Sequence, residues 1–448
     1  MKRLLDLNDD VLATILSFVR PADAIQLALT CHDAYSVAMP RYLSDVALGD
    51  TDPAVMSGPD QISLFCKYML ADVARRLRHL KALHIREGAF SRDAEGRDDW
   101  VSDYSCAPIL AETLRQAFNL RTLAIHDLEP LLAAEPALAD AFAPLTRLRD
   151  VAFHYIGKCT LQMLKLTTCH PQRLEFGMWK DGARVSGDTA AFYTYAGSLC
   201  TLNLWQCACL LESLSEDYVS HGVRTLGLGG RIPFLSMAAR QFPNATRITF
   251  AEECSIGEEA PVAAWSALDY VEGNMPIPFF ACRVRRIDLR FTLGAKLRPF
   301  SAETAFARTV EMLRQTSPVV LALKIDPALG PAKLAQLVAV LPRLRFLELA
   351  LHTEERQDAD RWMKEYVPCL AKTPLVGLAL RGQGRPDAAP EIARLAAATI
   401  PTLAHAGVCP AQRWTWFRAE RAARGEPVLE ALSGTRGEYV GNELRALA

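Results

Sequence analysis

The residue types that most often carry chemistry occur in three short runs of this chain. Cys31-His32-Asp33 places a thiol beside an imidazole and a carboxylate. Adjacent residues on a helix point in different directions, so this thiol and its base cannot face each other. The run therefore does not predict a nucleophilic catalytic site.

The other two runs are a cysteine pair and a glycine cluster. Cys207-Ala208-Cys209 supplies two soft ligands, whereas structural zinc takes four and the chain has no second CxC or CxxC pair. Gly227-Leu228-Gly229-Gly230 lacks the third glycine of a dinucleotide loop and the Lys-Ser/Thr of a phosphate loop. We therefore predict a non-catalytic protein with no metal site and no cofactor, in which these residues serve packing and turns.

Composition limits the classes of partner. Of 448 residues, 50 are basic and 51 acidic, and the net charge of −1 argues against nucleic acid or an anionic membrane as a partner. No apolar run approaches the roughly 18 residues of a membrane span, and acids at Asp6, Asp9 and Asp10 exclude a signal peptide. The spacing of the 12 cysteines shows no disulfide framework. We expect a soluble protein of the cytoplasm and/or nucleus with reduced thiols.

A short apolar signature, hydrophobic at its first, fourth and sixth positions, recurs twelve times beyond Asp60 at intervals of 22 to 40 residues. The copies read LKALHI from 80, LRTLAI from 120, LRDVAF from 148, PQRLEF from 171, LCTLNL from 199, VRTLGL from 223, ATRITF from 245, VRRIDL from 284, VLALKI from 320, LRFLEL from 344, LVGLAL from 375 and LAHAGV from 403. The segments between copies carry helical periodicity at 108–118 and 331–341, and Ser301 is placed to cap a third helix. The pattern predicts α/β repeats, each with one strand and one returning helix.

Successive strand residues point to opposite faces, so the third, fifth and seventh positions of each repeat share the face away from the core. Across eleven strand intervals this face spans on the order of 50 Å, enough for a protein segment. The candidates for binding a target there are His84, Arg86, His126, His154, Asn203, Trp205, Asp288, Arg290, Lys324, Asp326, Glu348 and Arg381. Trp205 is the first candidate for an anchor, because aromatic side chains dominate binding energy at interfaces, and the alternative is that a neighbouring loop buries it. His126 and His154 fall in adjacent repeats, where they could bind a metal or sense pH, but two solvated imidazoles are the favoured interpretation.

These repeats resemble the leucine-rich repeat, L-x-x-L-x-L-x-x-N/C-x-L. Only Cys207 fills the ninth position in the usual way, so we expect irregular turns. The resemblance implies a solenoid of about 12 units over residues 49–410, with parallel strands on the concave face and helices outside. Residues 411–448 follow as a capping β-hairpin and tail, because Arg413 to Arg418 and Val428 to Leu432 flank a glycine-containing turn.

The first 48 residues form a separate apolar segment. Asn8 can cap a helix that begins with Asp9 and Asp10, Pro21 restarts a second helix, and a third runs from about 33 to 43. Three short helices cannot hide this much apolar surface among themselves. The segment therefore either docks on a partner or covers the first repeat.

Leu7, Val11-Leu12, Ile15-Leu16-Ser17-Phe18-Val19, Pro21, Asp23, Leu27 and Leu29-Thr30-Cys31 resemble the F-box, with Asn8 in place of the family's usual proline. The resemblance implies docking on a Skp-type adaptor, and through it on a cullin scaffold, as a monomer within a hetero-complex. The implied adaptor-binding residues are Leu7, Val11, Leu12, Ile15, Leu16, Phe18, Val19, Pro21, Ile25, Leu27 and Leu29.

The sequence therefore predicts the substrate-recognition subunit of an SCF-type ubiquitin ligase, with an unknown target protein on the concave face. One alternative is a repeat scaffold that binds proteins with no ligase attached. Another is a cysteine-dependent enzyme with an unrecognised site.

Overall fold

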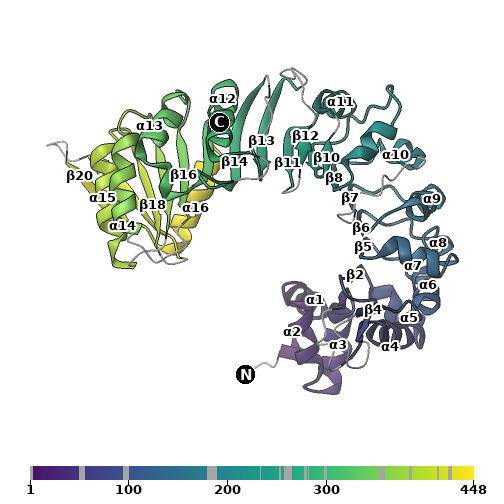
Figure 1. The fold of residues 1–448 in the computed structure, drawn as a ribbon. Helices are drawn as coiled ribbons and strands as arrows, with labels where there is room; N and C mark the ends of the chain where they lie inside the picture. Colours follow the sequence, from purple (N-terminus) through teal and green to yellow (C-terminus); the bar gives the residue numbers. More distant parts are fainter. Residues whose placement is uncertain are drawn as a thin grey trace. The chain divides into compact units, whose positions relative to one another are not determined.

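Strands and helices alternate along the chain in the computed structural model (Figure 1). The structure describes residues 4–49, 56–93, 100–178, 189–232, 234–251, 254–256, 265–276, 280, 282–296, 300–352, 359–382, 386–410, 413–421 and 426–448. The chain divides into two units, Met1–Val223 and Arg224–Ala448, each with its own set of neighbouring strands.

Unit 1 begins with a bundle of three helices, α1 (Asp9–Ser17), α2 (Pro21–Ala28) and α3 (His32–Tyr42). Asn8 caps α1, because its side chain accepts a hydrogen bond of 2.9 Å from the backbone N–H of Asp10. Pro21 opens α2, where its missing N–H costs nothing. The three predicted helices and both predicted starts are confirmed.

The sheet of unit 1 consists of parallel strands that neighbour one another in chain order. The strands are β1 (Asp45–Leu48), β2 (Ala82–Ile85), β5 (Thr122–Ile125), β6 (Asp150–His154), β7 (Arg173–Gly177) and β8 (Thr201–Trp205). The connecting helices are α4 (Gly58–Leu70), α5 (Val73–Arg76), α6 (Ala107–Gln116), α7 (Leu128–Ala134), α8 (Leu138–Ala141), α9 (Lys158–Leu166) and α10 (Ala190–Tyr195). A small antiparallel pair, β3 (Ser91–Asp93) and β4 (Trp100–Ser102), lies in the segment after β2.

Unit 2 shows the same alternation of strands and helices, and its middle strands are longer. Its parallel strands are β9 (Thr225–Leu228), β11 (Arg247–Phe250), β13 (Ala267–Gly273), β14 (Arg283–Leu293), β15 (Val320–Ile325), β16 (Phe346–Leu351), β17 (Gly377–Arg381) and β18 (His405–Cys409). Its helices are α11 (Leu235–Gln241), α12 (Ala302–Thr316), α13 (Pro331–Ala339), α14 (Ala359–Tyr366), α15 (Ala389–Thr399) and α16 (Gly434–Arg445). A short parallel pair, β10 (Arg231–Ile232) and β12 (Ser255–Ile256), stands apart from the main sheet.

All twelve copies of the apolar signature lie on strands, so the predicted α/β class with parallel strands is confirmed. Two further parallel strands of the main sheet were not predicted. Strand β1 belongs to a thirteenth copy, LSDVAL from 43, so the sheet begins inside the segment predicted as a separate domain. Strand β13 aligns its Leu268 and Val271 with the first and fourth positions, but Gly273 replaces the apolar sixth residue and conceals the signature.

The register also differs from the prediction at β15. An irregularity in the pairing of β14 with β15 lies between Asp288 and Thr292. Lys324 pairs with Ala350 on β16, and Ala350 pairs with Arg381 on β17. Because Ala350 and Arg381 are the seventh positions of their repeats, Lys324 is also a seventh position. Asp326 falls two residues beyond that row, where its carboxylate caps a short 3-10 helix by accepting from the Ala328 N–H. The prediction therefore placed the start of this copy two residues too late in the chain. The sequence alone did not fix the start, because Val319 to Leu321 are all apolar.

The predicted C-terminal hairpin is confirmed as β19 (Thr415–Arg421) and β20 (Pro427–Ala431), which pair antiparallel after β18. The sequence did not predict that the chain then returns as α16 over the strands (Figure 1). Leu444 of α16 lies in one buried cluster with Phe346 and Ala379, at third and fifth positions of their repeats. In unit 2, the face predicted to be free is covered here by the chain itself.

Two glycines let α16 approach the sheet closely. A Cβ at Gly437 would lie 2.8 Å from Cδ1 of Trp416, and one at Gly441 would lie 2.9 Å from its Cζ2. Gly434, in the first turn of the same helix, has open space around the position of a Cβ. Glycine lowers helix stability, so its presence at 437 and 441 reflects the packing of Trp416.

We predict that Gly437→Ala lowers the free energy of unfolding by about 1–3 kcal/mol, because the added methyl overlaps the Trp416 ring. Gly434→Ala is the matched control, and its better helix propensity should leave stability unchanged or slightly higher. Urea unfolding followed by tryptophan fluorescence measures both. Equal midpoints for the two variants would contradict this account of the packing.

Candidate functional site

The N-terminal bundle exposes apolar side chains along one side of α1. Val11, Ile15 and Phe18 recur at intervals of four and three residues, which places them on one side of the helix. All three are exposed, and Phe18 is 85% accessible. We call these three residues the apolar stripe. Leu29, directly after α2, is also exposed, at 71%.

The structure divides the residues predicted to bind an adaptor into three groups. Leu12 and Leu16 are buried with Ala24 and Ala28 of α2, so they hold the bundle together and are not available to a partner. The half-buried members are Leu7, Val19, Pro21, Ile25 and Leu27. The accessible members are the apolar stripe and Leu29.

A pocket that the sequence did not reveal lies beside the bundle. It has a volume of about 520 Å³ and is lined by residues of α3, β1 and α4, among them Met39, Phe65 and Leu64. The hydroxyls of Tyr35 and Tyr68 lie 3.0 Å apart at this pocket and link α3 to α4. The bundle is therefore fixed to the first repeat through α3, whereas the apolar stripe of α1 stays exposed.

In unit 1, the face that carries the third, fifth and seventh positions is open. We call it the open face of unit 1. Three predicted residues, His84, Arg86 and His126, line one pocket of about 440 Å³ there, together with Asp45. His84 Nε2 lies 3.6 Å from Asp45 Oδ1.

The imidazoles of His126 and His154 stack on this face with their ring centroids 4.2 Å apart. His154 Nε2 lies 3.8 Å from Glu175 Oε1, and Asn203 Nδ2 donates to Glu175 Oε2 at 2.9 Å. The two histidines, predicted to be solvated rings in preference to a metal site or a pH sensor, are therefore partly buried and joined to a row of polar side chains. Trp205 follows Asn203 on β8 and is half-buried.

Burial favours the neutral form of both histidines. It lowers the pKa of His126, which His154 lowers further, and it lowers the pKa of His154 despite the opposing charges of Glu175 and Glu87. Burial acts to raise the pKa of Glu175, but hydrogen bonds from Asn203 and Arg173 outweigh it and lower that pKa. At neutral pH the row holds two neutral rings beside one carboxylate.

We predict that unit 1 loses stability as the pH falls from about 7.5 to about 5.5. An unfolded histidine has a pKa of about 6.5, and the folded values lie lower, so the unfolded chain binds more protons in this window. Changing both His126 and His154 to Gln should flatten the dependence of the urea midpoint on pH. His32→Gln, at a fully exposed ring, is the control. An unchanged slope in the double variant would count against the effect.

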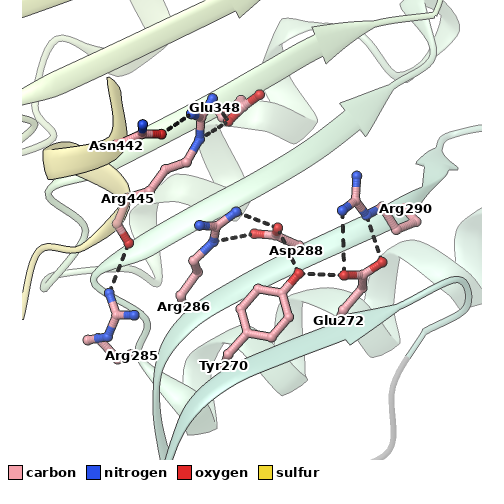
Figure 2. A network of polar contacts seen from close by, with 9 residues as sticks. All are labelled: Tyr270, Glu272, Arg285, Arg286, Asp288, Arg290, Glu348, Asn442 and Arg445. Atoms are coloured by element: carbon pink, nitrogen blue, oxygen red, sulfur yellow. Dashed lines mark hydrogen bonds and ion pairs between the residues drawn. The ribbon is translucent and has the colours of Figure 1, made fainter. Parts of the chain in front are cut away.

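The corresponding face of unit 2 carries a network of paired charges rather than an open row (Figure 2). Arg286 binds Asp288 through two hydrogen bonds of 2.9 and 2.6 Å, and Asp288 is only 3% accessible. Arg290 binds Glu272 at 2.9 and 3.4 Å. The hydroxyl of Tyr270 contacts both Asp288 and Glu272, and burial, together with these carboxylates, raises its pKa.

Helix α16 closes the network at its C-terminal end. Arg445 donates to Glu348 Oε2 at 3.1 and 3.0 Å. Arg285 donates to the carbonyl of Arg445 at 3.0 Å (Figure 2). It also donates to the carbonyl of Leu447 at 2.9 Å, so it holds the segment at the end of α16 against β14. Three predicted target-binding residues, Asp288, Arg290 and Glu348, are therefore occupied by partners within unit 2. Lys324 and Arg381 stay exposed, and Arg381 lies over the ring of Trp414 at 5.2 Å.

We predict that Arg286→Ala costs about 3–5 kcal/mol of stability, because it leaves the buried Asp288 without a counter-charge. Arg290→Ala is the matched control and should cost about 1 kcal/mol or less, since its side chain is half exposed. Chemical unfolding of both variants compares the losses. The interpretation of the network would be wrong if the two losses were equal.

The three runs with possible chemistry form no joint site. Cys31 caps α3 by accepting from the Ala34 N–H at 3.5 Å, and the His32 and Asp33 side chains point into solvent. Cys207 is buried and donates to the Phe176 carbonyl at 3.4 Å, and its burial raises its pKa. Gly227 and Leu228 lie within β9 rather than in a loop.

Within the described ranges, no group of three or more His, Cys, Asp or Glu side chains is placed to hold a metal ion. None of the helices in the described part of the chain has both the length and the apolar character needed to cross a membrane. No protein-family model and no curated protein matches the chain.

Proposed function

We propose that this protein is the target-binding subunit of an SCF-type ubiquitin ligase. The bundle of residues 9–42 resembles an F-box, and the signatures from 80 onward resemble leucine-rich repeats. In this proposal, the bundle docks on a Skp-type adaptor and the adaptor links the chain to a cullin scaffold. The repeats hold the target.

The observation that carries the proposal is the apolar stripe. Val11, Ile15 and Phe18 are exposed although Leu12 and Leu16 already supply the inner side of α1. Burying a side chain such as Phe18 stabilises a contact by about 1.5–3 kcal/mol. A row of such side chains on one small bundle favours attachment to a protein partner.

The target surface in this proposal is the open face of unit 1. The same face of unit 2 is covered by α16 over β15 to β17, and its charges are paired internally. On unit 1, the pocket beside His84, Arg86 and His126 and the half-buried Trp205 are accessible from one face. Shape and an aromatic anchor there suit a protein segment.

The proposed mechanism is proximity. Holding a target lysine near the thioester of a conjugating enzyme raises the effective concentration of the two groups. No group of this chain takes part in bond making, which separates the proposal from a cysteine-dependent enzyme. A thiol-reactive ubiquitin probe should form no adduct with the chain.

We predict that the full-length chain binds a Skp-type adaptor and that Phe18→Asp weakens this binding at least tenfold, because burial of the ring is lost and a charge is added. Phe118→Asp is the matched control, since Phe118 is also exposed in unit 1 but lies outside the bundle. Calorimetric titration with purified adaptor measures the affinities.

Two results would contradict the proposal. In the first, the unchanged chain shows no affinity for any Skp-type adaptor, which leaves a repeat scaffold without a ligase. In the second, Phe18→Asp binds as well as Phe118→Asp. Circular dichroism of each variant establishes that the bundle remains folded. Affinity capture from cells with the proteasome inhibited then identifies the target.

A further inference from the structure

A basic pocket lies at the edge of unit 1 where β5, β6 and β7 begin. Its volume is about 420 Å³. The lining residues are Arg121, Thr146, Arg147, Leu148, Arg149, His170 and Gln172. We call this site the basic pocket. It is distinct from the apolar stripe and from the pocket beside His84.

The repeat geometry brings these side chains together. The N–H of Arg149 donates to the carbonyl of Arg121 at 2.7 Å, and the N–H of Gln172 donates to the carbonyl of Arg149 at 2.8 Å. These residues therefore follow one another at the spacing of neighbouring strands, about 4.8 Å. Lys81 extends the row by one strand, because its carbonyl accepts from the N–H of Arg121 at 2.7 Å. Arg147 adds a third guanidinium from the turn before β6.

These guanidinium groups lack the partners that arginines have elsewhere in the molecule. Among the described residues, none of Arg121, Arg147 and Arg149 forms an ion pair, and Arg147 donates only to the amide oxygen of Asn119, at 2.7 Å. By contrast, Arg173 on the same sheet binds Glu175 at 3.2 Å. Although the net charge of the chain is −1, several positive charges without an ion-pair partner lie together in the basic pocket.

The residues just before β2, the strand next to β5, show the same excess of positive charge. Arg78 Nε lies 3.1 Å from His79 Nε2, beside Lys81. Burial lowers the pKa of His79, and the charges of Arg78 and Lys81 lower it further. The edge thus disfavours an additional cation and favours an anion.

We propose that the basic pocket binds an acidic protein segment, whose consecutive Asp or Glu carboxylates engage Arg121, Arg147 and Arg149. A guanidinium group matches a carboxylate with two parallel hydrogen bonds. Single-stranded nucleic acid usually stacks its bases on aromatic side chains, and the lining residues include no Phe, Tyr or Trp. The inference goes beyond the proposed function, because it needs neither the adaptor nor the open face.

The test uses the full-length chain and a fluorescein-labelled hexaglutamate peptide, with binding followed by fluorescence anisotropy. We expect saturable binding at about 50 mM salt that weakens at about 200 mM, as screening of exposed charges requires. Changing Arg121, Arg147 and Arg149 together to Gln should weaken binding roughly tenfold or more. Arg149→Gln alone should give a smaller loss.

Lys158→Gln is the control for the single variant, because it removes one exposed positive charge where α9 begins, at the opposite ends of the strands. It should bind like the unchanged chain. Phe18→Asp should also bind the peptide normally, so failure of the ligase proposal and failure of this one are distinguishable.

Three outcomes would overturn the proposal. One is no binding of hexaglutamate at low salt, and another is equal binding by the triple variant and the unchanged chain. The third is tighter binding of a labelled oligothymidylate of equal charge that the triple variant loses, which would assign the pocket to single-stranded nucleic acid. Thermal unfolding of the triple variant should match the unchanged chain, because the three side chains are exposed.

Discussion

The alternation of side chains along parallel strands is the constraint on which the rest of the structure depends. In nearly every repeat of both units, the fourth and sixth positions point toward the helices and are buried, as Leu83 and Ile85 are in β2. The remaining positions have no such requirement, so their chemistry is free to differ from one repeat to the next. These other positions therefore decide what the face of the sheet away from the helices can bind.

The two units use this freedom differently. In unit 1, the open face carries polar side chains that contact one another through single hydrogen bonds and ring stacking, and Nδ1 of His126 is buried with no hydrogen-bond partner among the described residues. In unit 2, arginines form ion pairs with carboxylates, and α16 lies over apolar side chains at third and fifth positions of the repeats. One unit retains an accessible polar surface, and the other has an additional layer of its core.

Much of the fold was predictable because it follows from a short periodic pattern. Twelve strands, the N-terminal helices and the hairpin could be located from residues close together in the sequence. Strand β13 could not, since Gly273 stands where an apolar residue is expected. Helix α16 could not either, because its three glycines oppose helix formation and its partners Trp416, Glu348 and Arg285 are remote or unrelated in pattern.

For the candidate sites, the sequence predicted the face on which a residue lies but not the residues that it contacts. Alternation placed Asp288, Arg290 and Glu348 on the correct face, but which guanidinium each carboxylate binds depends on contacts between repeats. Helical spacing alone separates Leu12 and Leu16 from Val11, Ile15 and Phe18, although the whole set was assigned to an adaptor. The basic pocket was missed because its members precede the strands rather than lie on them.

Arg285 binds the carbonyls of Arg445 and Leu447, so β14 is linked to the segment after α16 although the two are far apart in the sequence. Phe346, Ala379 and Trp416 share one buried cluster with Leu444, and a chain that lost α16 would expose them to solvent. Chaperones and proteases act on such exposed apolar surface. A truncation before Gly434 would therefore lower the amount of the protein in a cell as well as its length.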